Sequence, residues 1–355
     1  MAEEKYRRAS ECDPTYTNVW FNWGLLLFKQ VGAASNPAEK ARYQEMAEEK
    51  YRRATECDPT RADVWARWGI LLSEQTDDAS DPTEKTRYRE MAEEKYCRAT
   101  ECEPTNATVW FNWGVLLFRQ AEAASDPAEK ARYLKMTEEK YRRATECDPT
   151  LSAALSNWGT LLSEQADDVS DPAAKARYRE LADEKYRRAT EYDPTNINGW
   201  FNWGNLLSEQ ADDASDPAEK ARYRAMAEEK YRRATECDPT DATVWFSWGH
   251  LLFQQADGAS DPAEKARCRE LAEEKFRRTL ECDPKSTAVL YDLACCSALR
   301  NNVAESIQFL RQSRDAETLP SVSHLDQDKD LDPIRNTEEF KAFMAELPRD
   351  ENESA

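Results

Sequence analysis

Thr60-Arg-Ala-Asp-Val-Trp-Ala-Arg-Trp-Gly69 sets the period of this chain, because its Trp-x-x-Trp-Gly pattern returns every 45 residues. The pattern occurs intact in five places, and one further copy has Leu155 where the first tryptophan would stand. Its closing glycines are Gly24, Gly69, Gly114, Gly159, Gly204 and Gly249. A repeat of this length predicts an array of small, similar units and not one thick globular core.

The segment before each copy has the pattern of an amphipathic helix. Between Pro37 and Cys57, apolar residues recur at three- and four-residue spacings, which is typical of one helix face. Asn36 is the predicted N-cap, and the proline that follows it suits the first helical turn. Asp58-Pro59 ends the helix, because the residue before a proline disfavours the helical conformation.

A second kind of helix carries the repeated pattern itself. We expect it from Arg61 to Ala79, with Thr60 as its cap. Gly69 lies inside this helix, where glycine costs about 1 kcal/mol relative to alanine. Its return in six copies indicates a close contact between two helices that leaves no room for a side chain. Each unit is therefore predicted to be a pair of antiparallel helices, and the chain to be all-α.

This pattern closely resembles the tetratricopeptide repeat. The positions of the family's motif are filled by Trp65, Trp68-Gly69, Ala92, Tyr96, Ala99 and Pro104. The resemblance implies a right-handed superhelical solenoid of helix hairpins. The family unit has 34 residues, and the 11 additional residues here fall between the glycine and the first alanine. Because 11 residues make very nearly three helical turns, the apolar faces stay in phase, and we expect second helices of about 21 residues.

The repeat also divides the chain. Residues 1–14 are expected to be the final part of a second helix, residues 15–284 six long units, and residues 285–318 a unit of the ordinary 34-residue length. Residues 319–347 resemble the capping segment of such arrays, and residues 348–355 are expected to be a disordered tail. The open end of the first, partial unit admits two interpretations: self-association with another copy, or continuation in a longer protein.

Composition limits the partners. The formal net charge is −20, from 69 acidic and 49 basic residues, which argues against nucleic acid or an anionic membrane surface as the main partner. The excess of acidic residues either provides solubility or suits a ligand with a basic segment. The sequence shows neither a secretory signal nor an apolar run long enough to span a membrane. Direct membrane insertion is therefore not expected.

The ten cysteines predict a reducing compartment such as the cytoplasm. Six of them share one repeat phase, too far apart for disulfides, and Cys57 and its equivalents are interpreted as small buried apolar residues. The alternating aspartates 326–332 fail as a calcium loop, because Leu331 replaces the required glycine and Thr337 the bidentate glutamate. No Cys-x-x-Cys pair exists. We therefore expect no metal and no cofactor.

The resemblance places binding on the concave face, which the first helix of each unit lines. Positions there switch between phenylalanine and small polar residues, while core positions barely change. Such phenylalanines could anchor an apolar ligand segment or belong to the core, and the recurring asparagines could bind a peptide backbone or a neighbouring helix. The candidate groove residues are Phe21, Asn22, Phe28, Lys29, Arg67, Phe111, Asn112, Phe118, Arg119, Asn157, Phe201, Asn202, Asn205, Phe246, His250 and Phe253.

These patterns predict a non-enzymatic scaffold for protein–protein interaction that binds a peptide or a helix. The two histidines, His250 and His324, lie in separate regions of the sequence, and the glycines form no phosphate-binding loop. The alternatives are a receptor arm of organelle protein import and a regulatory or spacer arm of a larger protein. The resemblance also raises the family's site for the C-terminal carboxylate of a chaperone tail, which needs Lys and Arg at set positions of the groove. Only Arg67 could contribute to such a site here, so binding of a chaperone tail is not expected.

Overall fold

The computed structural model describes residues 2–347, and these form helices and no strand. The predicted disordered tail, residues 348–355, lies outside the described residues. The chain divides into two compact units, Met1–Tyr192 and Asp193–Ala355. The first unit contains α1 to α9 and the second contains α10 to α17, and each is described here by itself.

Six long hairpins repeat one pair of helices. The first helix of each pair has 17 residues: α2 (Thr17–Ala33), α4 (Ala62–Asp78), α6 (Ala107–Ala123), α8 (Ser152–Asp168), α10 (Ile197–Asp213) and α12 (Ala242–Gly258). The second has 21: α3 (Pro37–Cys57), α5 (Pro82–Cys102), α7 (Pro127–Cys147), α9 (Pro172–Tyr192), α11 (Pro217–Cys237) and α13 (Pro262–Cys282). The predicted length of the second helices is confirmed.

The remaining helices are shorter. An isolated helix, α1 (Ala2–Cys12), precedes the first hairpin and packs on α2. After the long hairpins come the short hairpin α14 (Val289–Leu299) and α15 (Val303–Asp315), and then α16 (Val322–Gln327), the 3-10 turn η1 (Lys329–Leu331) and α17 (Glu338–Glu346). Of these, η1 packs on α14 and α17 packs on α15.

Local sequence signals set most helix ends. The side chain of Asn36 accepts a hydrogen bond from the backbone N–H of Glu39 at 2.9 Å, as the predicted cap requires. The predicted start of α4 is wrong by one residue. Arg61 is its N-cap, without a side-chain bond, while the Thr60 hydroxyl donates instead to Asp58 at 2.6 Å. The hydroxyl is thus used by the turn between the helices and not by the helix.

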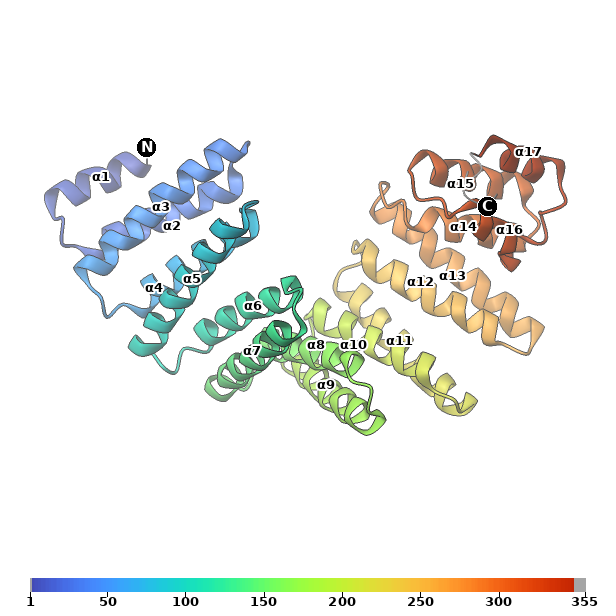
Figure 1. Ribbon diagram of the computed structural model, residues 1–355, viewed down its shortest axis with the longest axis horizontal. Coiled ribbons are helices and arrows are strands. Elements are labelled where there is room, and N and C mark those ends of the chain that lie inside the picture. The colour runs from blue at the N-terminus through green and yellow to red at the C-terminus, as the bar shows by residue number, and fades with distance from the viewer. Residues whose placement is uncertain (1, 348–355) are drawn as a thin grey trace. The chain divides into compact units, whose positions relative to one another are not determined.

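The two helices of each hairpin lie side by side along their whole length (Figure 1). Their contact centres on the repeated glycine. A Cβ atom built on Gly69 would lie 2.9 Å from the ring of Tyr96, which is fully buried. The expected close approach of the two helices at this glycine is confirmed, because a side chain there would meet an aromatic ring.

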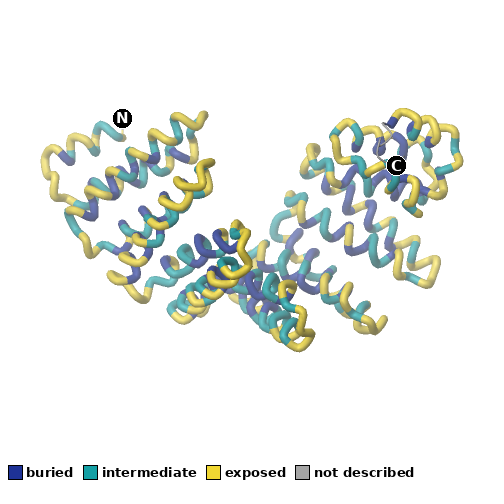
Figure 2. The backbone as a smooth tube through the Cα atoms, viewed as in Figure 1, coloured by how far each residue is buried: buried dark blue, intermediate teal, exposed yellow. Residues whose placement is uncertain are grey.

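Within each unit the hairpins stack in order. In the first unit each first helix contacts the next first helix, so that α2, α4, α6 and α8 form one layer; in the second unit α10 and α12 do the same. Each second helix also packs against the first helix of the next hairpin in its unit. Buried residues lie on the facing sides of the helices, while the loops at the hairpin ends are exposed (Figure 2).

The paired tryptophans connect the first helix of each hairpin to the loop that precedes it. In the second hairpin, the rings of Trp65 and Trp68 stack with centroids 5.8 Å apart, and the Trp65 indole N–H donates to the carbonyl oxygen of Pro59 at 2.8 Å. The ammonium of Lys95 on α5 lies 4.4 Å from the Trp68 ring centroid. This cation–π contact joins the two helices and was not visible in the sequence pattern. The tryptophans are therefore structural.

The cysteines that close the second helices are not buried apolar residues. Cys57, Cys147, Cys237 and Cys282 are only partly buried, and Cys12 and Cys102 are exposed. The Cys57 thiol lies 3.4 Å from the carbonyl oxygen of Pro14 in the preceding loop. The sequence interpretation is wrong because these residues end their helices at the edge of the stack, where the preceding loop covers only part of the side chain. All ten cysteines are free.

Candidate functional site

Two phenylalanine pairs lie on the layer of first helices in the first unit. Phe21 and Phe28 are on α2, and Phe111 and Phe118 are on α6; all four are partly buried. Phe21 packs against Tyr51 with ring centroids 6.4 Å apart, and Phe111 packs against Tyr141 at 6.1 Å. One side of the Phe21 and Phe111 rings thus belongs to the hairpin interface. All four side chains keep some exposed surface, and the guanidinium carbon of Arg61 lies 5.1 Å from the centroid of the Phe21 ring. The anchoring role of these phenylalanines stays a prediction.

Hairpins without the phenylalanine pair fill the same positions with small residues. On α8, Ser156 stands at the position of Phe21 and is only 2% exposed, while Thr160, at the position of Leu25, accepts a hydrogen bond from the Tyr186 hydroxyl at 3.1 Å. On α4, the hydroxyls of Ser73 and Tyr96 lie 3.2 Å apart. In these hairpins the buried tyrosine is satisfied by a short polar side chain of the first helix. Apolar and polar surface therefore alternate along the layer.

Charge alternates in the same order. The residue that follows Phe28, and its equivalents in the next three hairpins, are charged. In hairpins one to four these residues are Lys29, Glu74, Arg119 and Glu164. Lys29 and Arg119 are exposed, whereas Glu74 and Glu164 are partly buried. Arg119 forms an ion pair with Asp77 of the preceding hairpin. Basic residues thus accompany the phenylalanine pairs, and acidic residues accompany the polar hairpins.

Glu164 has an unusual environment. Burial, followed by the nearby negative charge of Glu122, raises the pKa of its carboxyl to about 7. Asp168 and Asp167 act in the same direction, and Lys130, which pairs with Asp168 at 2.8 Å, opposes them. A cationic ligand group near this carboxyl would stabilise its charged form.

The predicted asparagines do not behave alike. Asn22 is exposed, while Asn112, Asn157 and Asn202 are partly buried at the equivalent positions. Asn205 accepts a hydrogen bond from the Tyr231 hydroxyl at 2.8 Å, so this side chain satisfies its own hairpin. Arg67 is exposed on α4 beside this row.

The second unit continues the apolar positions on α10 and α12. Phe201 packs on Tyr231 with ring centroids 6.2 Å apart. Phe246 and Phe253 both pack on Phe276, at 6.1 and 6.3 Å. His250 is exposed, and its ring lies 6.0 Å from that of Phe246. The remaining predicted residues are therefore gathered on first helices of this unit.

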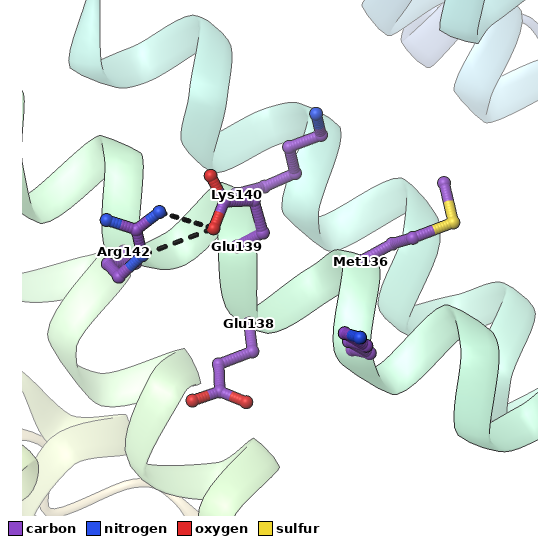
Figure 3. Close-up of a pocket in the computed structure, with 6 residues that line it drawn as sticks. Met136, Glu138, Glu139, Lys140 and Arg142 are labelled. Carbon is purple, nitrogen blue, oxygen red and sulfur yellow. Dashed lines mark hydrogen bonds and ion pairs between the residues drawn. The ribbon is translucent and has the colours of Figure 1, made fainter.

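The hollows in the protein surface do not coincide with the phenylalanine pairs. One lies along α7 and is lined by Lys135, Met136, Glu138, Glu139, Lys140 and Arg142; the Arg142–Glu139 ion pair lies beside it (Figure 3). Another lies between the ends of the second and third hairpins and includes Arg119, Asp77 and Tyr133. Most of its lining falls between the repeated glycine and the first alanine, where the 11 additional residues are. This second hollow thus lies in the lengthened part of the hairpins, and Arg119 is the one predicted residue in its lining.

Comparison with known proteins identifies the fold. No protein-family model and no curated protein sequence matches the chain. The C-terminal part of a tetratricopeptide-repeat protein from Cytophaga hutchinsonii superimposes with a TM-score of 0.53 at 10% identity, covering 88% of this chain and 99% of that one. PilF of Pseudomonas aeruginosa gives 0.49 at 16% identity, with 80% and 95% covered. The tetratricopeptide-repeat protein YrrB gives 0.42 at 17% identity, with 62% and 92% covered.

The repeated hairpins and the first of these superpositions define the fold as a tetratricopeptide-like solenoid of helix hairpins. The helices here are long, and the hairpin repeats every 45 residues and not every 34. Among residues 2–347, no helix is both long enough and apolar enough to cross a membrane.

Proposed function

We propose that the chain is a non-enzymatic scaffold that binds a peptide or a helix of a partner protein along its layer of first helices. The observation that carries the proposal is the half-buried state of the two phenylalanine pairs on α2 and α6. The rings of Phe21 and Phe111 pack against Tyr51 and Tyr141, and part of each of the four phenylalanine side chains stays accessible. Rigid aromatic side chains of this kind are frequent anchors in protein interfaces.

The spacing of the pairs suggests the form of the ligand. Packed helices lie about 8–10 Å apart, so two hairpins span about 20 Å. An extended peptide rises about 3.3 Å per residue, which places successive apolar anchors of the ligand about six residues apart. Between the two pairs lies the hairpin that carries Glu74, and after the second pair lies the one that carries Glu164. We therefore expect basic residues to follow the apolar ones in the ligand.

Selection from a random peptide library on the immobilised full-length chain tests this. The selected peptides are expected to share two apolar residues about six apart together with Lys or Arg. The double variant Phe111→Ser, Phe118→Ser is expected to lose this selection. The two new serines occupy positions equivalent to Ser156 and Ser163 of the fourth hairpin. Serine is therefore compatible with this hairpin fold at both positions.

Met136→Ser is the matched control. It replaces a partly buried apolar residue on the second helix of the same hairpin, beside the hollow of Figure 3. This variant is expected to select the same peptides as the wild type. The proposal is wrong if the double variant, shown to be helical by circular dichroism, selects the same peptides. It is equally wrong if the wild type selects none.

A further inference from the structure

Three metal-ligating side chains of the second unit lie together although they are far apart in the sequence. Cys295 is on α14, while Asp328 is the N-cap of η1 and Asp330 lies within that turn. The Cys295 Sγ and one carboxylate oxygen of each aspartate all lie within 4.8 Å of one another. Cys295 is 3% exposed and both aspartates are partly buried, so these groups face one another inside the fold and not across open solvent.

The separation of these atoms is close to that of ligands around one ion. The Cys295 Sγ and the Asp328 Oδ2 are 3.7 Å apart. Zinc bonds of about 2.3 Å to sulfur and about 2.1 Å to oxygen, at a tetrahedral angle, place two such ligands about 3.6 Å apart.

A fourth ligand is available at the edge of this group. The Nε2 atom of His324 on α16 lies 3.8 Å from the Asp328 Oδ2. The imidazole is exposed, and it packs edge-on against the ring of Tyr291 with centroids 5.8 Å apart. Either this imidazole or a water molecule can complete four-coordination from the solvent side.

Several carboxylates surround the group, and Arg269 and Lys265 are cations near Asp330. Asp292 on α14 is a further partly buried carboxylate beside Asp328. Among residues 2–347, the ion-pair partners of Asp328 and Asp330 are His324, when protonated, and Arg269. Arg269 is 3.8 Å from Asp330 and is shared with Asp257, also at 3.8 Å. A bound cation would offset the repulsion among these groups.

Hydrogen bonds alone offer a competing account of the same geometry. The Tyr291 hydroxyl donates to the Asp328 Oδ2 at 2.5 Å, and the backbone N–H of Asp330 donates to the Asp328 Oδ1 at 2.9 Å. These bonds would persist around a metal-bound carboxylate as supporting contacts. The Cys295 thiol also donates to the Asp328 Oδ2, at 3.7 Å. This thiol must lose its proton to bind a metal, and that difference can be measured.

We propose that Cys295, Asp328 and Asp330 bind one divalent transition-metal ion of the zinc class, with His324 or water as the fourth ligand. A thiolate and an imidazole suit zinc, whereas calcium and magnesium require oxygen ligands. The ion would fasten η1 and α16 onto α14. Sequence patterns predict a metal site from short spacings between ligands. They predict none here because Cys295 lies 33 residues before Asp328.

Cobalt(II), a spectroscopic substitute for zinc, is titrated into the reduced full-length chain. The expected result is a thiolate-to-cobalt charge-transfer band in the near ultraviolet that saturates at one equivalent and is abolished by zinc. Cys295→Ala is expected to lose the band and Cys296→Ala to keep it. The two cysteines are adjacent and equally buried, at 3% and 2% exposure, but only the first belongs to the group. A band that survives Cys295→Ala, or none in the wild type, overturns the proposal.

A carboxylate variant keeps the test decisive if Cys295→Ala does not fold. Asp330→Asn is expected to weaken zinc binding at least tenfold, measured by competition with a chromophoric chelator, because a ligand is lost. Asp326→Asn, an exposed aspartate of the same segment, is expected to bind zinc as the wild type does. Equal affinities of the two variants would show that Asp330 is not a ligand and would reject the site.

Discussion

Gly114 of α6 faces the ring of Tyr141 of α7 so closely that a Cβ atom on the glycine would lie 2.6 Å from the ring Cε1 and 2.7 Å from its Cδ1. Tyr141 is fully buried. The same relationship recurs in all six long hairpins, with a phenylalanine, Phe276, in place of tyrosine in the last. The contact fixes how closely, and in what register, the two helices pack.

Gly114→Ala is therefore expected to destabilise the chain. Overpacking a core costs about 1–3 kcal/mol, and the better helix propensity of alanine returns about 1 kcal/mol. The net loss should lower the urea midpoint. Gly32→Ala is the control, because nothing lies within 4 Å of a Cβ atom built there; it should be neutral or slightly stabilising. Equal midpoints for the two variants would contradict the role given to the glycine–ring contact.

Lys95→Met tests the cation–π contact between the helices of the second hairpin. The ammonium lies 4.4 Å from the Trp68 centroid and 5.6 Å from that of Trp65, and the side chain is 10% exposed. Its loss is expected to cost about 0.5–2 kcal/mol in urea unfolding and to shift the tryptophan fluorescence. Lys85→Met, at an exposed position of the same helix, should change neither. If the two variants unfold at the same urea concentration, Lys95 does not stabilise the hairpin through this contact.

Glu164→Gln tests the raised pKa on the first-helix layer. In the folded chain the pKa of this carboxyl is about 7, above its ordinary value of 4.5. The folded state thus holds the proton more tightly than the unfolded state, and this contribution to stability is lost as the pH rises from about 4.5 through 7. The glutamine variant lacks it. Relative to wild type, its melting temperature should therefore rise between pH 5 and pH 8.

Comparing each variant with wild type at every pH cancels the titration of other carboxyls. Asp167→Asn, which removes a carboxylate from a more exposed position on the same helix, is the control for the loss of one negative charge. A pH-independent difference between Glu164→Gln and wild type would show that Glu164 does not titrate in this range.

Glu101→Gln tests whether the charge of Glu101 lowers the reactivity of the exposed Cys97 and Cys102 thiols. The Cys97 Sγ lies 3.7 Å from a Glu101 carboxylate oxygen. Partial burial, and then the charge of Glu101, raise the pKa of both the Cys97 and the Cys102 thiols. Because the thiolate is the reactive form, the substitution should speed modification by a disulfide reagent at pH 7.5. Glu90→Gln, exposed on the same helix, should not. An unchanged rate would contradict the electrostatic link.

Local signals predicted the long hairpins well. Asn36, the proline after it and the Asp58-Pro59 step define α3, because caps and proline act through the backbone within a few residues. Periodicity also predicted the 21-residue length of the second helices. The glycine at the hairpin contact was recognisable because its repetition inside a helix, against its propensity, requires a tertiary cause.

The candidate surface was predictable only in part. Sequence alone could show that Phe111 and Phe118 vary together, but not that each is half-buried against its own hairpin, since burial depends on the neighbouring helix. Asn205 stays a predicted groove residue, and nothing in the sequence indicated that it accepts a hydrogen bond from the Tyr231 hydroxyl.

By itself, then, the sequence determined the secondary structure, the hairpin repeat and the 11-residue lengthening of each unit, because these follow from periodicity, capping and backbone restriction over short spans. Tertiary structure alone decided which side of each side chain is covered. It left Cys57 partly exposed at the edge of the stack, set Lys95 over the tryptophans, and placed Cys295 beside Asp328. Those outcomes depend on how separate helices pack, and no interval along the chain encodes the distance between them.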